Sequence, residues 1–175
     1  KGQQIDIDNL KDFHISCDGN TIITSNSEFL SSEINVYRFN EDKWNKLGQQ
    51  LKAGFNPSTS ISCDGKIITI ASWENKWNDN IPKLSADYYS FSVVIYQFNG
   101  STWQKLGQKI EEKFSKTQQG DRCKVTLSGD GATVAISKME PKHHGIVNVY
   151  KLKDNHWVQK GQILYGTNYS FGASL

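Results

Sequence analysis

Apolar and polar residues alternate in a pattern that occurs three times along the chain. The copies are EINVYRFNEDKWNKLGQQL at 33–51, SVVIYQFNGSTWQKLGQKI at 92–110 and IVNVYKLKDNHWVQKGQIL at 146–164. Each has a β-branched apolar run, a four-residue polar turn, a tryptophan and then a Gly-Gln strand. This order predicts a β-hairpin. Its recurrence predicts a repeat protein.

A second repeated element precedes each hairpin. It reads ISCDGNTIIT at 15–24, ISCDGKIITI at 61–70 and LSGDGATVAI at 127–136. Asp-Gly between two alternating runs favours a tight turn, because glycine tolerates positive φ and aspartate can bond its own backbone. The repeating unit is therefore predicted to have four antiparallel strands in meander order.

The third strand of the unit indicates how the units pack. It carries Ile34 and Val36 on one face and Tyr37 and Phe39 on the other, and the later copies do the same. A strand that is apolar on both faces must be covered on both. A two-sheet sandwich would leave its outer face polar. We therefore predict an all-β fold of β-propeller blades, with three complete blades and orphan strands at both ends.

The predicted division of the chain follows the repeats. Residues 1–5 match the last strand of a preceding blade, 6–51 form blade 1, 52–110 blade 2, 111–164 blade 3, and 165–175 the first strand of a following blade. Propellers use about four to eight blades. We therefore expect neighbouring blades from a longer chain or from other subunits. The opening KGQQI is neither an initiator methionine nor a signal sequence, so we expect a processed product or part of a longer protein.

Length variation is confined to two kinds of connection. The Asp-Gly turns and the polar hairpin turns are constant, whereas the connections after the second and fourth strands vary, and in a meander these lie at one rim. The longest, SWENKWNDNIPKLSADYYSFS at 72–92, supplies the candidate binding residues Trp73, Trp77, Tyr88 and Tyr89. Long loops on rigid scaffolds carry function, and aromatic residues serve interfaces and sugar platforms. The alternative is that these rings fold back as a cap.

Charge and hydropathy exclude several partners. Lys and Arg number 20 against 18 Asp and Glu, so a nucleic-acid or anionic-membrane partner is not favoured. No apolar run approaches the roughly 20 residues that span a bilayer, so we expect no membrane insertion. The three cysteines form no CxxC motif, and Cys17 and Cys63 are expected to be small buried thiols. This usage slightly favours a reducing compartment or a virion over secretion.

The recurring polar residues are expected to be structural. The aspartates Asp18, Asp64 and Asp130 are explained by turn chemistry. The serines Ser16, Ser62 and Ser128 are explained by local hydrogen bonding. The tryptophans Trp44, Trp103 and Trp157 are explained by packing at the blade edge. His143 and His144 lack further residues at ligand spacing. We predict no catalytic residue, no metal and no cofactor.

The Ser-x-Asp-Gly turns, together with the tyrosine, tryptophan and glycine of each hairpin, resemble a β-propeller repeat family of bacterial surface, algal and giant-virus proteins. That family is distantly similar to integrin-α and WD-type propellers. The resemblance covers nearly all of the chain and implies adhesion or scaffolding, with no shared catalytic motif. The Asp- and Gly-rich calcium loop of integrin-type repeats is missing here, so its metal site does not carry over. The Asn, Lys and Ile content fits a giant virus or a protist.

Two functions follow from these observations. The first is a non-catalytic interaction or structural module, part of a larger propeller, that binds a protein or glycan through the variable-loop face. The alternative is a carbohydrate-active enzyme or lectin with its site on the same face. An enzyme would need two carboxylates at the separation used in glycoside hydrolysis. The candidates are Glu74, Asp79, Asp87, Glu111, Glu112 and Glu140.

Overall fold

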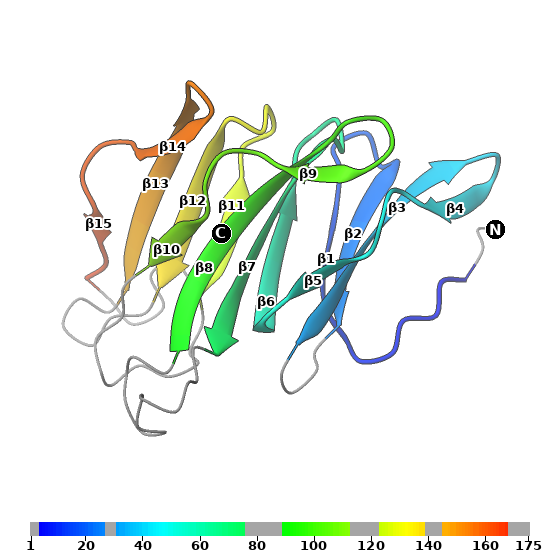
Figure 1. Cartoon of the computed structure of the whole chain (residues 1–175), viewed down its shortest axis with the longest axis horizontal. Helices are drawn as coiled ribbons and strands as arrows, with labels where there is room; N and C mark the ends of the chain where they lie inside the picture. Colours follow the sequence, from blue (N-terminus) through cyan, green and yellow to red (C-terminus); the bar gives the residue numbers. More distant parts are fainter. Residues whose placement is uncertain (1–3, 27–30, 76–88, 113–122, 139–144, 168–175) are drawn as a thin grey trace.

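Three antiparallel β-sheets stand side by side in the computed structural model of the chain (Figure 1). The structure describes residues 4–26, 31–75, 89–112, 123–138 and 145–167, and every regular element within these ranges is a strand. We call the sheets A, B and C in chain order. They lie at the right, centre and left of Figure 1.

Each sheet has the same plan of three meander strands followed by two short strands that both pair with the third. Sheet A comprises β1 (Leu10–Ile15), β2 (Thr21–Asn26), β3 (Ser32–Asn40), β4 (Lys43–Lys46) and β5 (Leu51–Ala53). Sheet B comprises β6 (Phe55–Ile61), β7 (Ile67–Asn75), β8 (Tyr89–Phe98), β9 (Trp103–Lys105) and β10 (Ile110–Glu112). Sheet C comprises β11 (Lys124–Leu127), β12 (Thr133–Lys138), β13 (Ile146–Lys153), β14 (His156–Gln159) and β15 (Leu164–Tyr165).

The two short strands together are the fourth strand of the predicted unit, which is broken rather than continuous. In sheet A, β3 pairs with β4 through Tyr37 and Lys46 and with β5 through Ile34 and Leu51. The break falls at Gly48, which has a φ of 74°. Glycine adopts this left-handed conformation without the steric cost that other residues incur. The Gly-Gln pair is therefore a corner in the outer strand.

The Ser-x-Asp-Gly segments form the predicted turns. In the first, Asp18 accepts hydrogen bonds from the Ser16 hydroxyl and from the Asn20 N–H at 2.9 Å. The Ser16 oxygen in turn accepts the Thr21 N–H at 2.9 Å. The same contacts recur at 62–67 and 128–133. The expectation of local bonding is confirmed at all three serines.

The long connection predicted at 72–92 is shorter in the structure. β7 and β8 remain paired from Ile67 opposite Gln97 to Asn75 opposite Tyr89, so 72–75 and 89–92 are strand rather than loop. The prediction missed a period-2 alternation, since Ala71 and Trp73 face sheet C while Ser72 and Glu74 face sheet A. In Figure 1, β7 ends and β8 begins at the lower rim.

Two apolar cores separate the three sheets. The core between sheets A and B contains Ile23, Ile34, Val36, Leu51, Ile61, Ile68, Ile70 and Trp103. The core between sheets B and C contains Ala71, Trp73, Phe91, Val93, Ile95, Ile110, Cys123, Val125, Leu127, Val134, Ile136 and Trp157. The third strand of sheet B contributes to both, because Val93 and Ile95 face sheet C while Tyr96 and Phe98 face sheet A. Coverage of this strand on both faces is therefore confirmed.

Candidate functional site: the blade interfaces and the end faces

A tryptophan of sheet B is held by the outer corner of sheet A. The Trp103 indole N–H donates to the Leu47 carbonyl at 2.7 Å. The Gln49 side-chain amide accepts the Trp103 N–H at 2.9 Å and donates to the Trp103 carbonyl at 2.8 Å. A Cβ on Gly48 would lie 2.8 Å from Trp103 Cδ1. We call this set of contacts the interlock.

The same interlock joins sheets B and C. The Trp157 indole donates to the Leu106 carbonyl at 2.8 Å, and the Gln108 amide pairs with both backbone groups of Trp157. A Cβ on Gly107 would again lie 2.8 Å from Trp157 Cδ1. The glycine and glutamine of the repeat are therefore explained by a tryptophan in the next sheet. Both tryptophans are only 3 % exposed, in line with the predicted packing role.

The outward face of sheet C carries an unfilled half of this interlock. Gly161, with a φ of 75°, has no atom of the described residues within 4 Å of its Cβ position, and Gln162 is exposed. Leu164 is 46 % exposed, whereas the equivalent Leu51 and Ile110 are 8 % and 6 % exposed. Among the described residues, the third corner therefore has the backbone of the other two but no tryptophan against it.

The outward face of sheet A is uncovered in a complementary way. Ile15 is 53 % exposed, against 8 % for Ile61 and 7 % for Leu127 at the same position of the other sheets. Phe13 on the same strand is 62 % exposed. Trp44, the counterpart of the two buried tryptophans, is half-buried. Both ends of the row of sheets thus present apolar residues that the internal interfaces bury.

Within the interface between sheets B and C, a carboxylate takes part in a buried polar network. Glu112 accepts hydrogen bonds from Lys138 at 3.1 Å, from the Asn148 amide at 3.0 and 3.1 Å, and from the Tyr150 hydroxyl at 2.9 Å. The Glu112 and Lys138 side chains are 5 % and 11 % exposed. Burial and the adjacent carboxylate raise the pKa of Tyr150. Paired in this way, the charges are compatible with the interior.

The equivalent place between sheets A and B is a cavity of about 220 Å³. Ala53 occupies the position of Glu112, Ser72 that of Lys138 and Val94 that of Asn148, while Tyr96 matches Tyr150. The cavity is lined by Lys52, Ala53, Gly54, Ile70, Ser72, Glu74, Val94 and Tyr96. Burial, and secondarily Glu74, raise the pKa of Tyr96.

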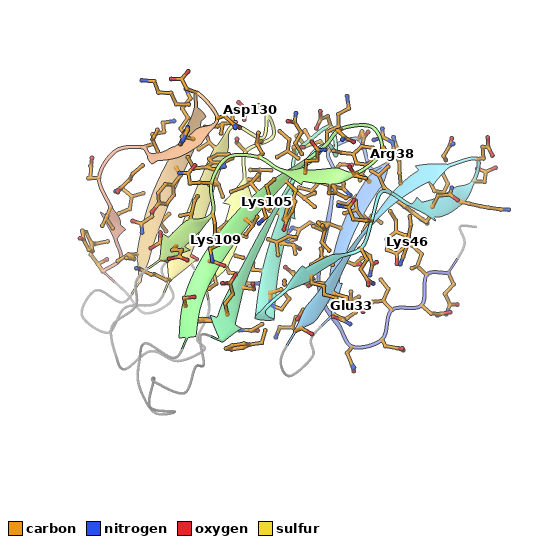
Figure 2. All side chains as sticks on the ribbon, in the orientation of Figure 1. Glu33, Arg38, Lys46, Lys105, Lys109 and Asp130 are labelled. Carbon is orange, nitrogen blue, oxygen red and sulfur yellow. A yellow bond between two sulfur atoms is a disulfide. The ribbon has the colours of Figure 1, made fainter. Side chains whose placement is uncertain are left out.

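Two of the candidate carboxylates for an enzyme come together beside this cavity. Lys109, labelled in Figure 2, contacts Glu74 and Glu111 at 3.0 Å each. Desolvation lowers the pKa of Lys109, but its hydrogen bonds to Glu111 and Glu74 outweigh this and raise it. The two carboxyls of a glycosidase flank the scissile bond and one of them donates a proton to it, whereas both of these carboxylates contact the same ammonium group. The arrangement is therefore an ion-pair network rather than an acid–base pair.

The predicted binding residues are distributed differently from the expectation. Trp73 is only 2 % exposed and packs edge-on against Phe91 with ring centroids 5.4 Å apart, so it belongs to the core and offers no surface to a ligand. The Tyr89 backbone opens β8, and its side chain lies outside the described part of the chain. Trp77 and Tyr88 also lie outside the described residues.

Cys17 and Cys63 form a disulfide, which corrects the expectation of two buried thiols. Their Cα atoms are 4.4 Å apart, and the bond joins the Asp-Gly turns of sheets A and B across 46 positions of sequence. Sheet C has Gly129 at this place, and its carbonyl accepts the Cys63 N–H at 2.8 Å. The pairing escaped sequence analysis because the contact between two turns depends on how the sheets stack. Disulfides are typical of oxidising environments.

The three turn aspartates precede β2, β7 and β12, at the rim opposite the one where β7 ends and β8 begins. Figure 2 places Asp130 at this upper rim and Glu33 towards the lower one. Hydrogen bonds from Ser16 and from the Asn20 N–H lower the pKa of Asp18, and equivalent bonds from Ser128 and the Ala132 N–H lower that of Asp130. For Asp64, desolvation raises the pKa, but the bonds from the Lys66 N–H and Ser62 outweigh it.

In the described ranges, no group of three or more His, Cys, Asp or Glu residues is placed to hold a metal ion. No helix in the same ranges is long and apolar enough to cross a membrane.

Stacked four-stranded antiparallel meanders define blades of the β-propeller type, and the chain has this fold. Solved structures show the same architecture. A candidate 6-phosphogluconolactonase from Bacteroides fragilis is 10 % identical with a TM-score of 0.56, over 90 % of this chain and 39 % of that one. A second from Bacteroides uniformis is 13 % identical with a TM-score of 0.56, over 93 % and 42 %. A eukaryotic initiation factor is 10 % identical with a TM-score of 0.54, over 92 % and 36 %.

At these identities the similarity shows the fold alone. The chain spans roughly two fifths of the length of these proteins. No protein-family model matches the sequence. No curated protein matches it either.

Proposed function

We propose that the chain is a non-catalytic structural and interaction module, a row of three blades within a larger propeller whose variable-loop face binds a protein or glycan. The observation that carries this proposal is the contrast between equivalent positions. Ile15 and Leu164 are about half exposed at the two ends, while their counterparts inside the row are at most 8 % exposed. Burial of apolar area stabilises by about 25 cal/mol per Å², so further blades on both faces would stabilise the row.

Two further points support a scaffold role. The recurring serines and aspartates are engaged in the turns, and Gln49 and Gln108 are engaged in the interlocks, which supports a structural role for them. The resemblance of the repeats to propellers of surface, algal and giant-virus proteins also implies adhesion or scaffolding. The variable connections remain the proposed binding face, with Trp77, Tyr88 and Tyr89 as its candidate aromatic residues.

Hydrogen exchange tests the assembly. We expect the amides of β1 and β15 to exchange much faster in the isolated 175-residue chain than in the protein purified from its natural source. Amides of β7 and β8, in the central sheet, are the internal control and should exchange slowly in both. A natural protein with the mass of this chain alone, and with β1 equally unprotected, would refute the proposal.

A second candidate function is sugar binding in the cavity between sheets A and B. Its lining combines the apolar Ile70 and Val94 with the polar groups of Tyr96, Ser72 and Glu74. Lys109 and the lining Lys52 together match the two carboxylates Glu74 and Glu111 in charge, so a neutral polyhydroxylated ring fits better than an ion. The cavity is smaller than the usual 300–1,000 Å³ or so of ligand pockets, and thus suits one sugar residue.

A glycan array with matched variants tests this candidate. Ala53→Leu fills the cavity and should abolish binding, whereas Ser101→Leu, which adds the same side chain to an exposed hairpin turn, should retain it. If the parent chain binds no glycan on the array, or if both variants bind equally well, the cavity is excluded as a sugar site.

A further inference from the structure

We propose that the corner formed by Lys160, Gly161 and Gln162 on sheet C is a recognition site for a tryptophan-bearing β-hairpin from a further four-stranded blade. The inference rests on the proposed function and adds to it the residues and the partner chemistry. It is carried by two filled copies of the same site within this chain.

The backbone of the third corner is already arranged as in the filled copies. The Lys160 N–H donates to the Val149 carbonyl at 2.7 Å, just as Leu47 donates to Val36 and Leu106 to Ile95. The φ of Gly161, 75°, matches the 74° and 73° of Gly48 and Gly107. The site is therefore formed without its occupant, and binding would not have to organise the corner.

The filled copies also define which side chain fits. The indole must donate to the carbonyl of the residue before the glycine, and its Cδ1 must lie about 2.8 Å from the Cβ position of the glycine, which is too close for any other residue there. Phenylalanine could occupy the space but has no donor for that carbonyl. The side-chain amide of the glutamine then bonds to the backbone N–H and carbonyl of the same tryptophan, in the way that the backbone of a neighbouring β-strand would. Together these contacts select a tryptophan at the start of an outer strand.

One difference at the third corner restricts further which residues the partner can present to it. Leu47 and Leu106 pack against the apolar cores, whereas Lys160 is exposed at the equivalent position. The partner residue that faces Lys160 should therefore be polar or acidic rather than apolar. Leu164, 46 % exposed, supplies the apolar contact that Leu51 and Ile110 make in the filled copies.

The experiment uses the 175-residue chain and a cyclised hairpin peptide with the sequence of residues 92–106. Cyclisation is needed because an isolated two-stranded hairpin is only marginally stable in water. We expect peptide-dependent shifts of the Gly161 and Gln162 amide resonances. Replacement of the peptide tryptophan by alanine should weaken binding by about tenfold or more, since it removes both the hydrogen bond and the apolar contact.

Three protein variants separate recognition from folding. Gly161→Asn keeps a residue that tolerates the left-handed backbone but places a Cβ where the indole must lie. Because no described residue lies within 4 Å of that Cβ position, the melting temperature should stay within a few degrees while peptide binding is lost. Gly107→Asn is the matched variant at a filled corner, and it should lower the melting temperature strongly. Gln162→Ala should weaken peptide binding and leave stability unchanged.

The outcomes distinguish this inference from the proposed function. If the β1 and β15 amides are protected in the natural protein but Gly161→Asn binds the peptide as the parent chain does, the recognition site is refuted and the larger propeller stands. If the chain alone forms a dimer that both Trp44→Ala and Gly161→Asn abolish, a second copy occupies the corner and the assignment to a further blade is overturned. If the peptide shifts the Gln162 amide in the parent chain but not in the Gly161→Asn variant, the assignment holds.

Discussion

The interface between sheets A and B and the interface between sheets B and C are alike at the outer corner and different inside. Both have the interlock, with nearly identical distances at Trp103 and Trp157. Inside, the second interface contains the Glu112 network, whereas the first has Ala53 and a cavity of about 220 Å³. Only the first is also joined by a disulfide, Cys17–Cys63.

This difference shows which contacts define a blade and which are replaceable. The outer corner is filled in the same way in both interfaces. The close approach of the tryptophan ring requires glycine at the corner, and the indole N–H is the donor for the carbonyl before that glycine. The interior of the interface can be filled by several combinations of residues. A buried ion pair must offset its own desolvation, so apolar residues can replace it at little cost in stability. Sheets of this kind can therefore keep one geometry of stacking while each interface acquires its own interior.

The largest effect is expected at the feature that the two interfaces share. Trp103→Ala and Trp157→Ala should each lower the free energy of unfolding by about 3–5 kcal/mol, the range for large buried aromatic residues. Trp44→Ala is the control, and because Trp44 is only half-buried it should cost less than half as much. Urea denaturation measures all three. Equal losses at the three positions would mean that the interlock adds nothing to stability.

A similar or slightly smaller effect is expected at the network that only the second interface has. Glu112→Ala leaves Lys138 buried without its carboxylate partner, which typically costs about 3–5 kcal/mol. Glu74→Ala removes a carboxylate from the edge of the first interface, where both Glu74 and Lys109 are 37 % exposed, and should cost about 1 kcal/mol or less. The same denaturation series compares them. A Glu112→Ala variant as stable as Glu74→Ala would show that the network is dispensable.

The disulfide that only the first interface has should contribute next. In the Cys17→Ser, Cys63→Ser double variant, a loop of 46 residues is no longer closed in the unfolded chain, and we expect a loss of about 2–4 kcal/mol. Reductant should lower the stability of the parent chain by the same amount and leave the variant unchanged. If reductant acts equally on both proteins, the stabilisation does not come from this bond.

The smallest effect is expected from the turn aspartates, which all three sheets share. The folded-state pKa values of Asp18, Asp64 and Asp130 are lowered, so their stabilisation is present above the unfolded value of about 3.9 and is lost as pH falls below it. A triple Asp→Asn variant should therefore show a shallower decline of stability between about pH 4 and pH 2. Unfolding curves across that range measure it, and an unchanged slope would contradict the assignment.

Much of the fold could be predicted from particular residues. Ile34 and Val36 opposite Tyr37 and Phe39 predict a strand covered on both faces, because side chains alternate with a period of two. The bounds around Trp73 were less accurate. Its aromatic neighbours suggested a binding loop, but the alternation of Ala71, Ser72, Trp73 and Glu74 continues the strand and buries the ring.

The site was harder to predict, because its parts are distant in sequence. Gln49 and Trp103 are 54 positions apart, and Glu112 and Lys138 are 26 apart. The recurrence of glycine, glutamine and tryptophan was visible in the repeats and could have indicated a mutual contact. Pairing the tryptophan of one unit with the glycine of the preceding unit required the stacking of the sheets.

The amino-acid sequence by itself determined the strands, the turns and the repeat, because these depend on side-chain periodicity and on backbone preferences that act over a few residues. Only the tertiary structure decided that Cys17 bonds to Cys63, that the position of Glu112 is a cavity in the neighbouring interface, and that Gly161 is the unfilled member of a series. Such features depend on which faces of successive sheets meet, and no local preference of the chain encodes that.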